Sequence, residues 1–326
     1  MIFERIWAGV PDALSLGLLW GVMAIGVYIT YKLLDVADLS VDGSFATGGC
    51  VSAILTIQGM HSFASIGIAF LAGMAAGLVT GVLHTKLKIP AILSGILTML
   101  GLYSINLRIS NGRPNHPMPN FGSNKVSTVI DHLCEQWNLD QKTAVIFFGA
   151  VLALVIIGLL YWFFGTELGS LIRATGNNAD MARAMGGNTD NMKILGLVLS
   201  NGFVAFSGAI VAQSQRYGDV NMGTGTIVVG LASIIIGEVI FGKNRHFALR
   251  LLSVFVGSMV YRLVIAVVLV LGMNPNDMKI LTAGIVAFAL SVPTLSSYVR
   301  NTLQKSANKK EQKKRLLQNA TKKEDR

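Results

Sequence analysis

The charged residues between positions 173 and 190 are the first candidates for a functional site. The segment reads RATGNNADMARAMGGNTD and places Arg173, Asp180, Arg183 and Asp190 among alanines, methionines and asparagines. Long apolar runs flank it on both sides, and charges are costly in hydrocarbon. We therefore expect a short helix in a water-exposed loop, where charges and methionines can bind another protein.

A second candidate is an arginine inside an apolar run. Arg262 lies near the middle of segment 247–272, too far from either end for its side chain to reach water easily. If that segment crosses a membrane, the arginine costs about 2.5 kcal/mol or more and needs a partner or a water-filled cavity. We expect Asp42 as the partner, with Glu238 as the second choice. The pair either flanks a translocation path, where it can bind the carboxylate and ammonium of an amino acid, or only fixes two helices.

Other polar residues of the apolar runs divide between transport and packing. Asn106, Asn201 and Ser207 stand within such runs, where most polar groups hydrogen-bond across helices. Asp38 and Asp42 enter a short, broken run together with two serines. The candidates for a substrate pathway are Asp38, Ser40, Asp42, Ser44, Asn201 and Arg262.

Residues for covalent catalysis or metal binding follow no recognisable pattern. Residues 237–244, GEVIFGKN, approach a phosphate-binding loop, but Asn244 replaces the Ser or Thr that would hold magnesium, and the segment ends an apolar run. The five histidines lack metal-ligand spacing, and no Ser/His/Asp set can be placed at one depth. We expect no enzyme activity, no metal site and no cofactor bound by this chain.

Composition indicates a protein with many membrane spans. Of 326 residues, 52% are hydrophobic and 13% charged, and the mean hydropathy is +0.57, whereas soluble domains carry roughly 25% charged residues. The expected fold is all-α and polytopic, with one transmembrane domain (1–298) and a basic tail (299–326). Cys50 and Cys134 fall at different predicted depths, so no disulfide is expected.

About nine segments (8–10) are long and apolar enough for transmembrane helices. They are roughly 12–34, 43–58, 63–84, 89–108, 143–165, 191–213, 224–241, 247–272 and 278–296. The second segment is short, and its entry carries Asp35, Asp38 and Asp42. This favours a discontinuous or re-entrant element that lines a cavity.

The distribution of positive charge predicts the orientation. Lys86, Lys88, the 173–193 segment and the 243–250 cluster fall on one side if the spans alternate, and the positive-inside rule makes that side cytoplasmic. The loop of about 166–192 is then cytoplasmic. The loop of about 109–142 is external, with an HPMP turn and an amphipathic stretch that could meet a binding protein. The side of the N-terminus stays open.

The tail is expected on the cytoplasmic side as well. Residues 300–326 hold ten Lys/Arg and three Asp/Glu, a local charge of +7 (10 − 3). Such a tail after a last span favours anionic lipid headgroups. A nucleic-acid partner is not expected, because no aromatic or glycine-rich binding module accompanies the charge.

Three segments together resemble the permease subunits of ABC importers of the ribose and branched-chain amino-acid superfamily. The first is DLSVDGS at 38–44, close to the family's D-L-S-V-G-S with one residue inserted. The second is GLVTGVLHTKLKIP at 77–90, followed by NGRP at 111–114. The third and most specific is 173–186, which matches R-A-x-G-x-N-x-x-x-A-R-x-x-G. The resemblance covers about 15–295 and is nearest to an uncharacterised or tryptophan/tyrosine-type subgroup, through LSVDGSF and through KILGLVLSNGFVAFS at 193–207.

The resemblance implies that the 166–192 loop holds a cytoplasmic coupling helix, which docks in a groove of an ATP-hydrolysing subunit. Met181, Met185 and Ala182 would supply adaptable apolar contacts, and Arg173 and Arg183 charge-specific ones. A solvated connector that binds nothing is the alternative. The implied coupling residues are Arg173, Asn177, Asn178, Met181, Ala182, Arg183, Met185 and Gly186.

The resemblance also implies an assembly in the cell membrane. A second permease copy, identical or related, would pair with this chain, with two ATPase subunits that bind ATP and Mg²⁺ and an extracytoplasmic substrate-binding lipoprotein. The implied function is inward transport of a small solute by alternating access, with an aromatic or other amino acid as first expectation and sugars, nucleosides and peptides as alternatives. Asp42, an acid added to the ribose-type pattern, argues against a sugar. A secondary transporter or channel without an ATPase and a membrane receptor or scaffold are the other classes left open.

Overall fold

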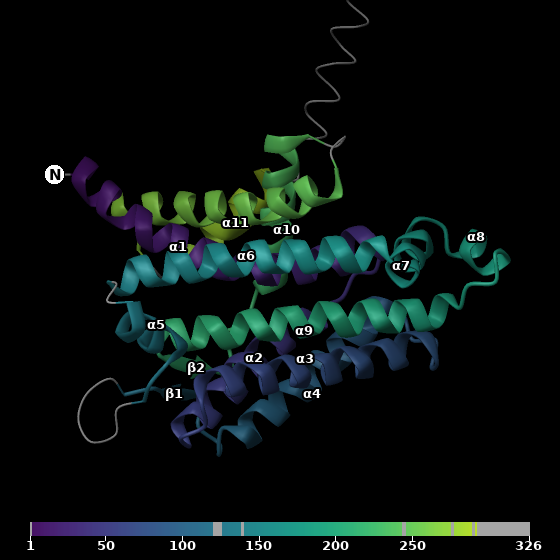
Figure 1. The fold of residues 1–326 in the computed structure, drawn as a ribbon, viewed down its shortest axis with the longest axis horizontal. Helices are drawn as coiled ribbons and strands as arrows, with labels where there is room; N and C mark the ends of the chain where they lie inside the picture. Colours follow the sequence, from purple (N-terminus) through teal and green to yellow (C-terminus); the bar gives the residue numbers. More distant parts are fainter. Residues whose placement is uncertain are drawn as a thin grey trace, which may run out of the picture.

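The computed structural model describes residues 2–119, 126–137, 140–242, 246–274, 277–288 and 291. In this part the chain forms a bundle of long helices whose axes are roughly aligned with one another (Figure 1). The helices are α1 (Ile2–Tyr28), the π-helix η1 (Ile29–Leu33), α2 (Ser40–Ile57), α3 (Ser62–Thr85), α4 (Ala91–Ile109), α5 (Val129–Trp137), α6 (Gln141–Gly165), α7 (Glu167–Asn177), α8 (Ala179–Ala184), α9 (Thr189–Gln215), α10 (Thr226–Phe241) and α11 (Phe247–Val270).

Within the described residues, the predicted apolar segments fall on helices. Seven described helices are long and apolar enough to cross a membrane, namely α1 with η1, α2, α3, α4, α6, α9 and α11. Two further segments, α10 and Met278–Phe288, are apolar but shorter. Of the about nine (8–10) expected transmembrane helices, seven of this length and two shorter ones lie in the described residues, and the predicted ninth segment, 278–296, lies partly outside them. The predicted tail, 299–326, lies outside them.

Three helices form the centre of the bundle. In α1, α2 and α9, 83%, 83% and 78% of the most apolar window is buried, against 28% to 39% in α3, α4, α6 and α11. The central helices are rich in small residues, which let backbones approach closely. The outer helix α3 approaches central helix α9 in the same way, through its glycines. A Cβ at Gly73 would lie 2.4 Å from the Asn201 carbonyl oxygen, and a Cβ at Gly77 would lie 2.3 Å from the Leu197 carbonyl oxygen. The glycine face of α3 thus packs against α9 within this chain.

The second predicted span forms one continuous helix, α2, so the predicted break lies before this helix, at its acidic entry, and not within it. Residues 34–39 between η1 and α2 are not helical. A second irregular stretch, residues 220–225, precedes α10. The second stretch packs against the first turn of α2, directly after the first stretch, because a Cβ at Gly223 would lie 1.9 Å from the Asp42 carbonyl oxygen. Irregular backbone at such depth is tolerated where protein surrounds it.

The two ends of the bundle differ in structure. α7 and α8 form one end, and the N-terminus lies at the opposite end with α5 and the strands β1 (Asn115–Pro117) and β2 (Tyr217–Asp219) (Figure 1). The strands pair antiparallel, with His116 opposite Gly218. The HPMP turn predicted at 116–119 is therefore wrong, because His116 and Pro117 belong to β1. That pairing joins segments about 100 residues apart, which local sequence does not reveal.

Candidate functional site

The residues between α6 and α9 form two short helices where the sequence predicted one. We call residues 166–188 the α7–α8 segment. The Thr166 side chain accepts a hydrogen bond from the Gly169 N–H (3.3 Å) at the start of α7, and Asn178 accepts one from the Met181 N–H (2.9 Å) at the start of α8. Gly186 follows α8 with φ +85°. The asparagine and the glycine thus turn the chain twice.

Most predicted coupling residues are exposed on this segment. Met181 and Met185 are 51% and 80% exposed. The exposed residues also include Arg173, Asn177, Asn178, Arg183 and Gly186. Ala182 is only 1% exposed, so its predicted role as an outward apolar contact is wrong. The chain turns back over it, and the Gly187 N–H donates to the Ala182 carbonyl oxygen (3.0 Å).

The α7–α8 segment is firmly attached to the bundle. Ile172 is fully buried, and α7 contacts η1, α6 and α9. A Cβ at Gly176 would lie 1.9 Å from the Leu33 carbonyl oxygen, so only glycine fits against η1 there. A guanidinium N–H of Arg183 donates to the Thr189 hydroxyl (3.0 Å) at the start of α9. A displacement of the segment would therefore reach the ends of two central helices.

Four of the predicted pathway residues meet in a closed cluster at the start of α2. The Asn201 Nδ2–H donates to Asp38 Oδ2 (2.8 Å), and its Oδ1 accepts from the Ser44 hydroxyl (2.6 Å). Asp38 Oδ1 accepts from the Ser40 N–H (2.8 Å). All four residues are buried. We call them the Asn201 cluster; it ties the first turn of α2 to the middle of α9.

Asp42 holds the start of α10. Its carboxylate accepts hydrogen bonds from the Gly225 N–H (2.8 Å), the Thr226 hydroxyl (2.8 Å) and the Ile227 N–H (2.9 Å). A carboxylate at a helix N-terminus satisfies free N–H groups and interacts favourably with the helix dipole. The predicted ion pair with Arg262 is wrong, because both Asp42 oxygens are used in this cap.

Arg262 has an aromatic partner instead. Its guanidinium lies 3.9 Å from the centre of the Trp20 ring, which packs against Phe45 at 4.9 Å. Glu238, the second predicted partner, pairs with Lys32 (2.9 Å). Among the described residues the buried Arg262 Nε has no hydrogen-bond partner. Sequence reasoning missed Trp20; the signal was present, since a tryptophan face is the preferred aromatic partner of arginine.

The opposite end of the bundle is closed by a polar anchor. Gln213 of α9 is buried; its Nε2–H donates to the Ser65 hydroxyl (3.0 Å), and its Oε1 accepts from the Val129 N–H (3.0 Å). Nearby, Arg216 forms an ion pair with Asp131. Burial alone raises the pKa of Asp131, but hydrogen bonds from Thr128 and the charge of Arg216 hold this pKa below its usual value of 3.8.

The arrangement defines a class of protein. Apolar helices surround buried polar clusters and a half-buried arginine, and one end carries an exposed but anchored pair of short helices. This is a membrane-embedded transport component. A solved structure supports that fold: an inward-facing conformation of a protein assigned to the metal-chelate type of ABC transporter aligns with a TM-score of 0.50 and 16% identity, over 88% of this chain and 84% of that one.

The chain belongs to the family described as branched-chain amino acid transport system / permease component, whose model matches residues 10–291. Similar relatives include the tyrosine transport system permease protein of Clostridioides difficile (strain R20291), 39% identical over 95% of this chain and 100% of the relative. The uncharacterized protein RP368 of Rickettsia prowazekii (strain Madrid E) is 31% identical, over 89% and 98%. The ribose import permease protein RbsC of Escherichia coli (strain K12) is 24% identical, over 83% and 81%.

These findings confirm the resemblance drawn from the three sequence motifs. The chain is a multi-pass permease component of an ABC importer of this family, and it is not itself an enzyme. The ATPase of such a system is a separate subunit, and the system implies ATPase and binding-protein partners.

Proposed function

We propose that this permease imports an amino acid, most readily an aromatic one. It would act as a dimer, and an ATPase subunit, the motor, would dock on the α7–α8 segment of each copy. The support for docking is one observation: Met181 and Met185 are exposed on helices that are anchored to η1 and α9. Methionines adapt to a partner surface, and the anchor passes a displacement to the central helices. ATP-driven closure of two motor subunits would then bring the two α7–α8 segments together and reverse the side to which the pathway opens.

The proposed orientation places the α7–α8 end in the cytoplasm of the cell. Gly81 near the end of α3 packs against Ile194 near the start of α9, and Lys86 and Lys88 follow α3 directly, so they belong to the α7–α8 end. The N-terminus lies at the other end (Figure 1). An extracytoplasmic binding protein would meet the end with α5, β1 and β2. The tail, 299–326, would follow the last span on the cytoplasmic side. Each chain supplies one α7–α8 segment, and two motor subunits need two such segments. We therefore propose a homodimer.

The docking proposal is tested with the double variant Met181→Asp/Met185→Asp. Both changes put charge where an apolar contact is expected, so ATP-driven uptake by the reconstituted assembly should fall at least about tenfold. The thermal stability of the permease should not change, because both side chains are exposed. Lys142→Gln at the opposite end is the matched control and should transport normally. Normal uptake by the double variant, or uptake by the permease without any ATPase, would refute docking and favour a secondary transporter.

The proposed pathway runs beside Trp20 and Arg262. The guanidinium is held over the indole and its Nε lacks a protein partner among the described residues, so it can bind a substrate carboxylate. The Asn201 cluster and Asp42 would shape this path by fixing α2 and α10. The name of the tyrosine permease relative supports an amino acid as the substrate.

The substrate proposal is tested by competition. Uptake of labelled tyrosine through the cognate binding protein should be blocked by aromatic amino acids and not by ribose. Arg262→Met should reduce uptake by about tenfold or more while the assembly still hydrolyses ATP, and Arg262→Lys should recover only part, because lysine lacks the planar fork. Ribose uptake, or full tyrosine uptake by Arg262→Met, would overturn this assignment.

A further inference from the structure

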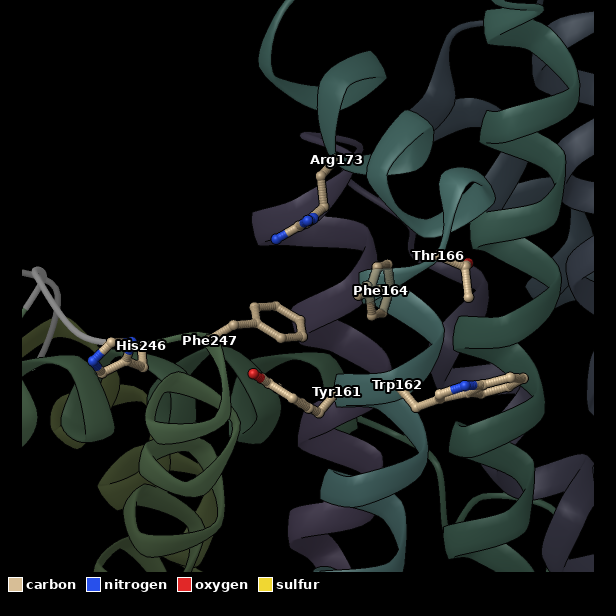
Figure 2. A pocket seen from close by; sticks show the side chains of 8 residues that line it. Tyr161, Trp162, Phe164, Thr166, Arg173, His246 and Phe247 are labelled. Carbon is tan, nitrogen blue, oxygen red and sulfur yellow. The ribbon is translucent and has the colours of Figure 1, made fainter.

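An open groove lies between the last turn of α6, helix α7 and the first residues of α11. Its volume is about 520 Å³. In Figure 2, Arg173 and Tyr161 point towards Phe247, with His246 beyond it at the start of α11. We propose that this groove binds the phosphate headgroup of an anionic phospholipid from the cytoplasmic leaflet. The site adds a lipid ligand to the protein partners of the transporter.

The groove lies at the expected level of lipid headgroups. The exposed face of α6 is apolar up to Leu159, which is 51% exposed. The next turn carries Tyr161 and Trp162, 57% and 70% exposed, and the helix ends at Gly165. An exposed apolar helix face that finishes in Tyr and Trp is typical of a membrane–water interface. The groove therefore opens where acyl chains end and headgroups begin.

The lining of the groove carries positive and no negative side chains among the described residues. The positive charge comes from Arg173, and the imidazole of His246 also lines the groove. The Arg173 guanidinium lies 5.5 Å from the centre of the Phe247 ring, and its hydrogen bond to the Ser170 hydroxyl is long, at 3.5 Å. The ring orients the guanidinium and leaves its planar N–H donors available to a phosphate.

The shape of the groove favours a phospholipid over a free anion. Aromatic rings line it, and it continues onto the apolar face of α6. A headgroup can sit between Arg173 and His246 while its acyl chains follow α6. Free phosphate would gain the charge contacts but not the apolar ones. The groove also joins α7 to α11, the helix of Arg262, so the bound lipid would connect the docking segment to the proposed pathway. This consequence and the choice of the cytoplasmic leaflet rest on the proposed function.

The test is lipid binding by the purified full-length permease, followed by native mass spectrometry. Phosphatidylglycerol should bind more tightly than phosphatidylethanolamine. Arg173→Gln should lower the affinity for the most tightly bound phosphatidylglycerol molecule by about fivefold. Arg183→Gln removes the same charge from the same end but outside the groove, and should bind as the wild type does. The basic tail contributes equally to all three proteins. Binding to the detergent-solubilised permease needs no ATPase, so this test stands apart from the docking test.

Three results would overturn the lipid site. The first is equal phosphatidylglycerol binding by wild type and Arg173→Gln. The second is complete displacement of the lipid by inorganic phosphate, which would make the groove a simple anion site. The third is that Arg173→Gln changes the number of permease copies per particle and leaves the number of bound lipids unchanged. The groove would then be a contact between permease copies. Phe247→Leu and His246→Gln provide the same comparison if Arg173→Gln does not fold.

Discussion

The α7–α8 segment and the Asn201 cluster use the same residue types for opposite purposes. In the segment, Asn178 caps a short helix at the surface, and methionines beside it stay exposed. In the cluster, Asn201 is buried, and its amide is satisfied by Asp38 and Ser44. Amide and hydroxyl groups at the end of the bundle therefore shape an exposed surface, which we propose binds a partner, whereas those inside it fix helices to one another.

The difference matters for a transporter. A motor can move the pathway only if the docking surface is accessible and the helices behind it move as a unit. The exposed segment meets the first condition, and the closed Asn201 cluster, together with the Asp42 cap, meets the second. Substitutions in the two regions should therefore separate stability from transport.

The largest effect on stability is expected for Asn201→Leu. The change leaves Asp38 buried without its amide donor, and the free energy of unfolding should fall by about 3 kcal/mol or more. Thermal unfolding in detergent measures this loss. Asn177→Leu, an exposed amide of the α7–α8 segment, is the control and should change stability by less than about 0.5 kcal/mol. Adding Asp38→Asn to Asn201→Leu should restore part of the stability; if Asn201→Leu is as stable as the wild type, the cluster is not an anchor.

A smaller loss is expected for Asp42→Ala. The variant removes the cap from α10 and should cost about 1–2 kcal/mol, again measured by thermal unfolding. Asp35→Asn changes an exposed acid five residues before the start of α2; it is the matched control and should be neutral. The opposite pattern for Asp42→Ala, unchanged stability with abolished transport, would show that Asp42 binds the substrate instead of the helix.

The smallest effect is a pH dependence at the opposite end. The pKa of Asp131 is held below 3.8, so its contribution to stability is complete above that pH and is lost as the pH falls through the lowered pKa. The wild type should lose about 1 kcal/mol more than Asp131→Asn between pH 5 and pH 2. Parallel unfolding curves for the two proteins across this range would contradict the assigned ion pair with Arg216.

The sequence predicted the helices well because apolar runs of about 20 residues have few other solutions in a membrane. The acids at 35–42 marked the irregular entry to the second span, although the span itself is continuous, and the 173–186 motif located the α7–α8 segment. The partners of individual charges were not predictable. We predicted a pair between Asp42 and Arg262 because opposite charges attract. In the structure, Asp42 accepts hydrogen bonds from three donors at the start of α10, and the Arg262 guanidinium lies over the Trp20 ring. Such choices depend on helix rotation and on irregular stretches such as 220–225, which apolar patterning does not encode.

The proposed mechanism requires that a separate ATPase subunit binds the α7–α8 segment. The most direct measurement is a disulfide crosslink from Met185→Cys to a cysteine in the cognate ATPase subunit, in a permease whose Cys50 and Cys134 are replaced by alanine. We expect a crosslinked permease–ATPase species from Met185→Cys and none from Lys142→Cys at the other end. An assembled, ATP-hydrolysing complex in which Met185→Cys stays uncrosslinked, whatever ATPase position carries the second cysteine, would contradict it.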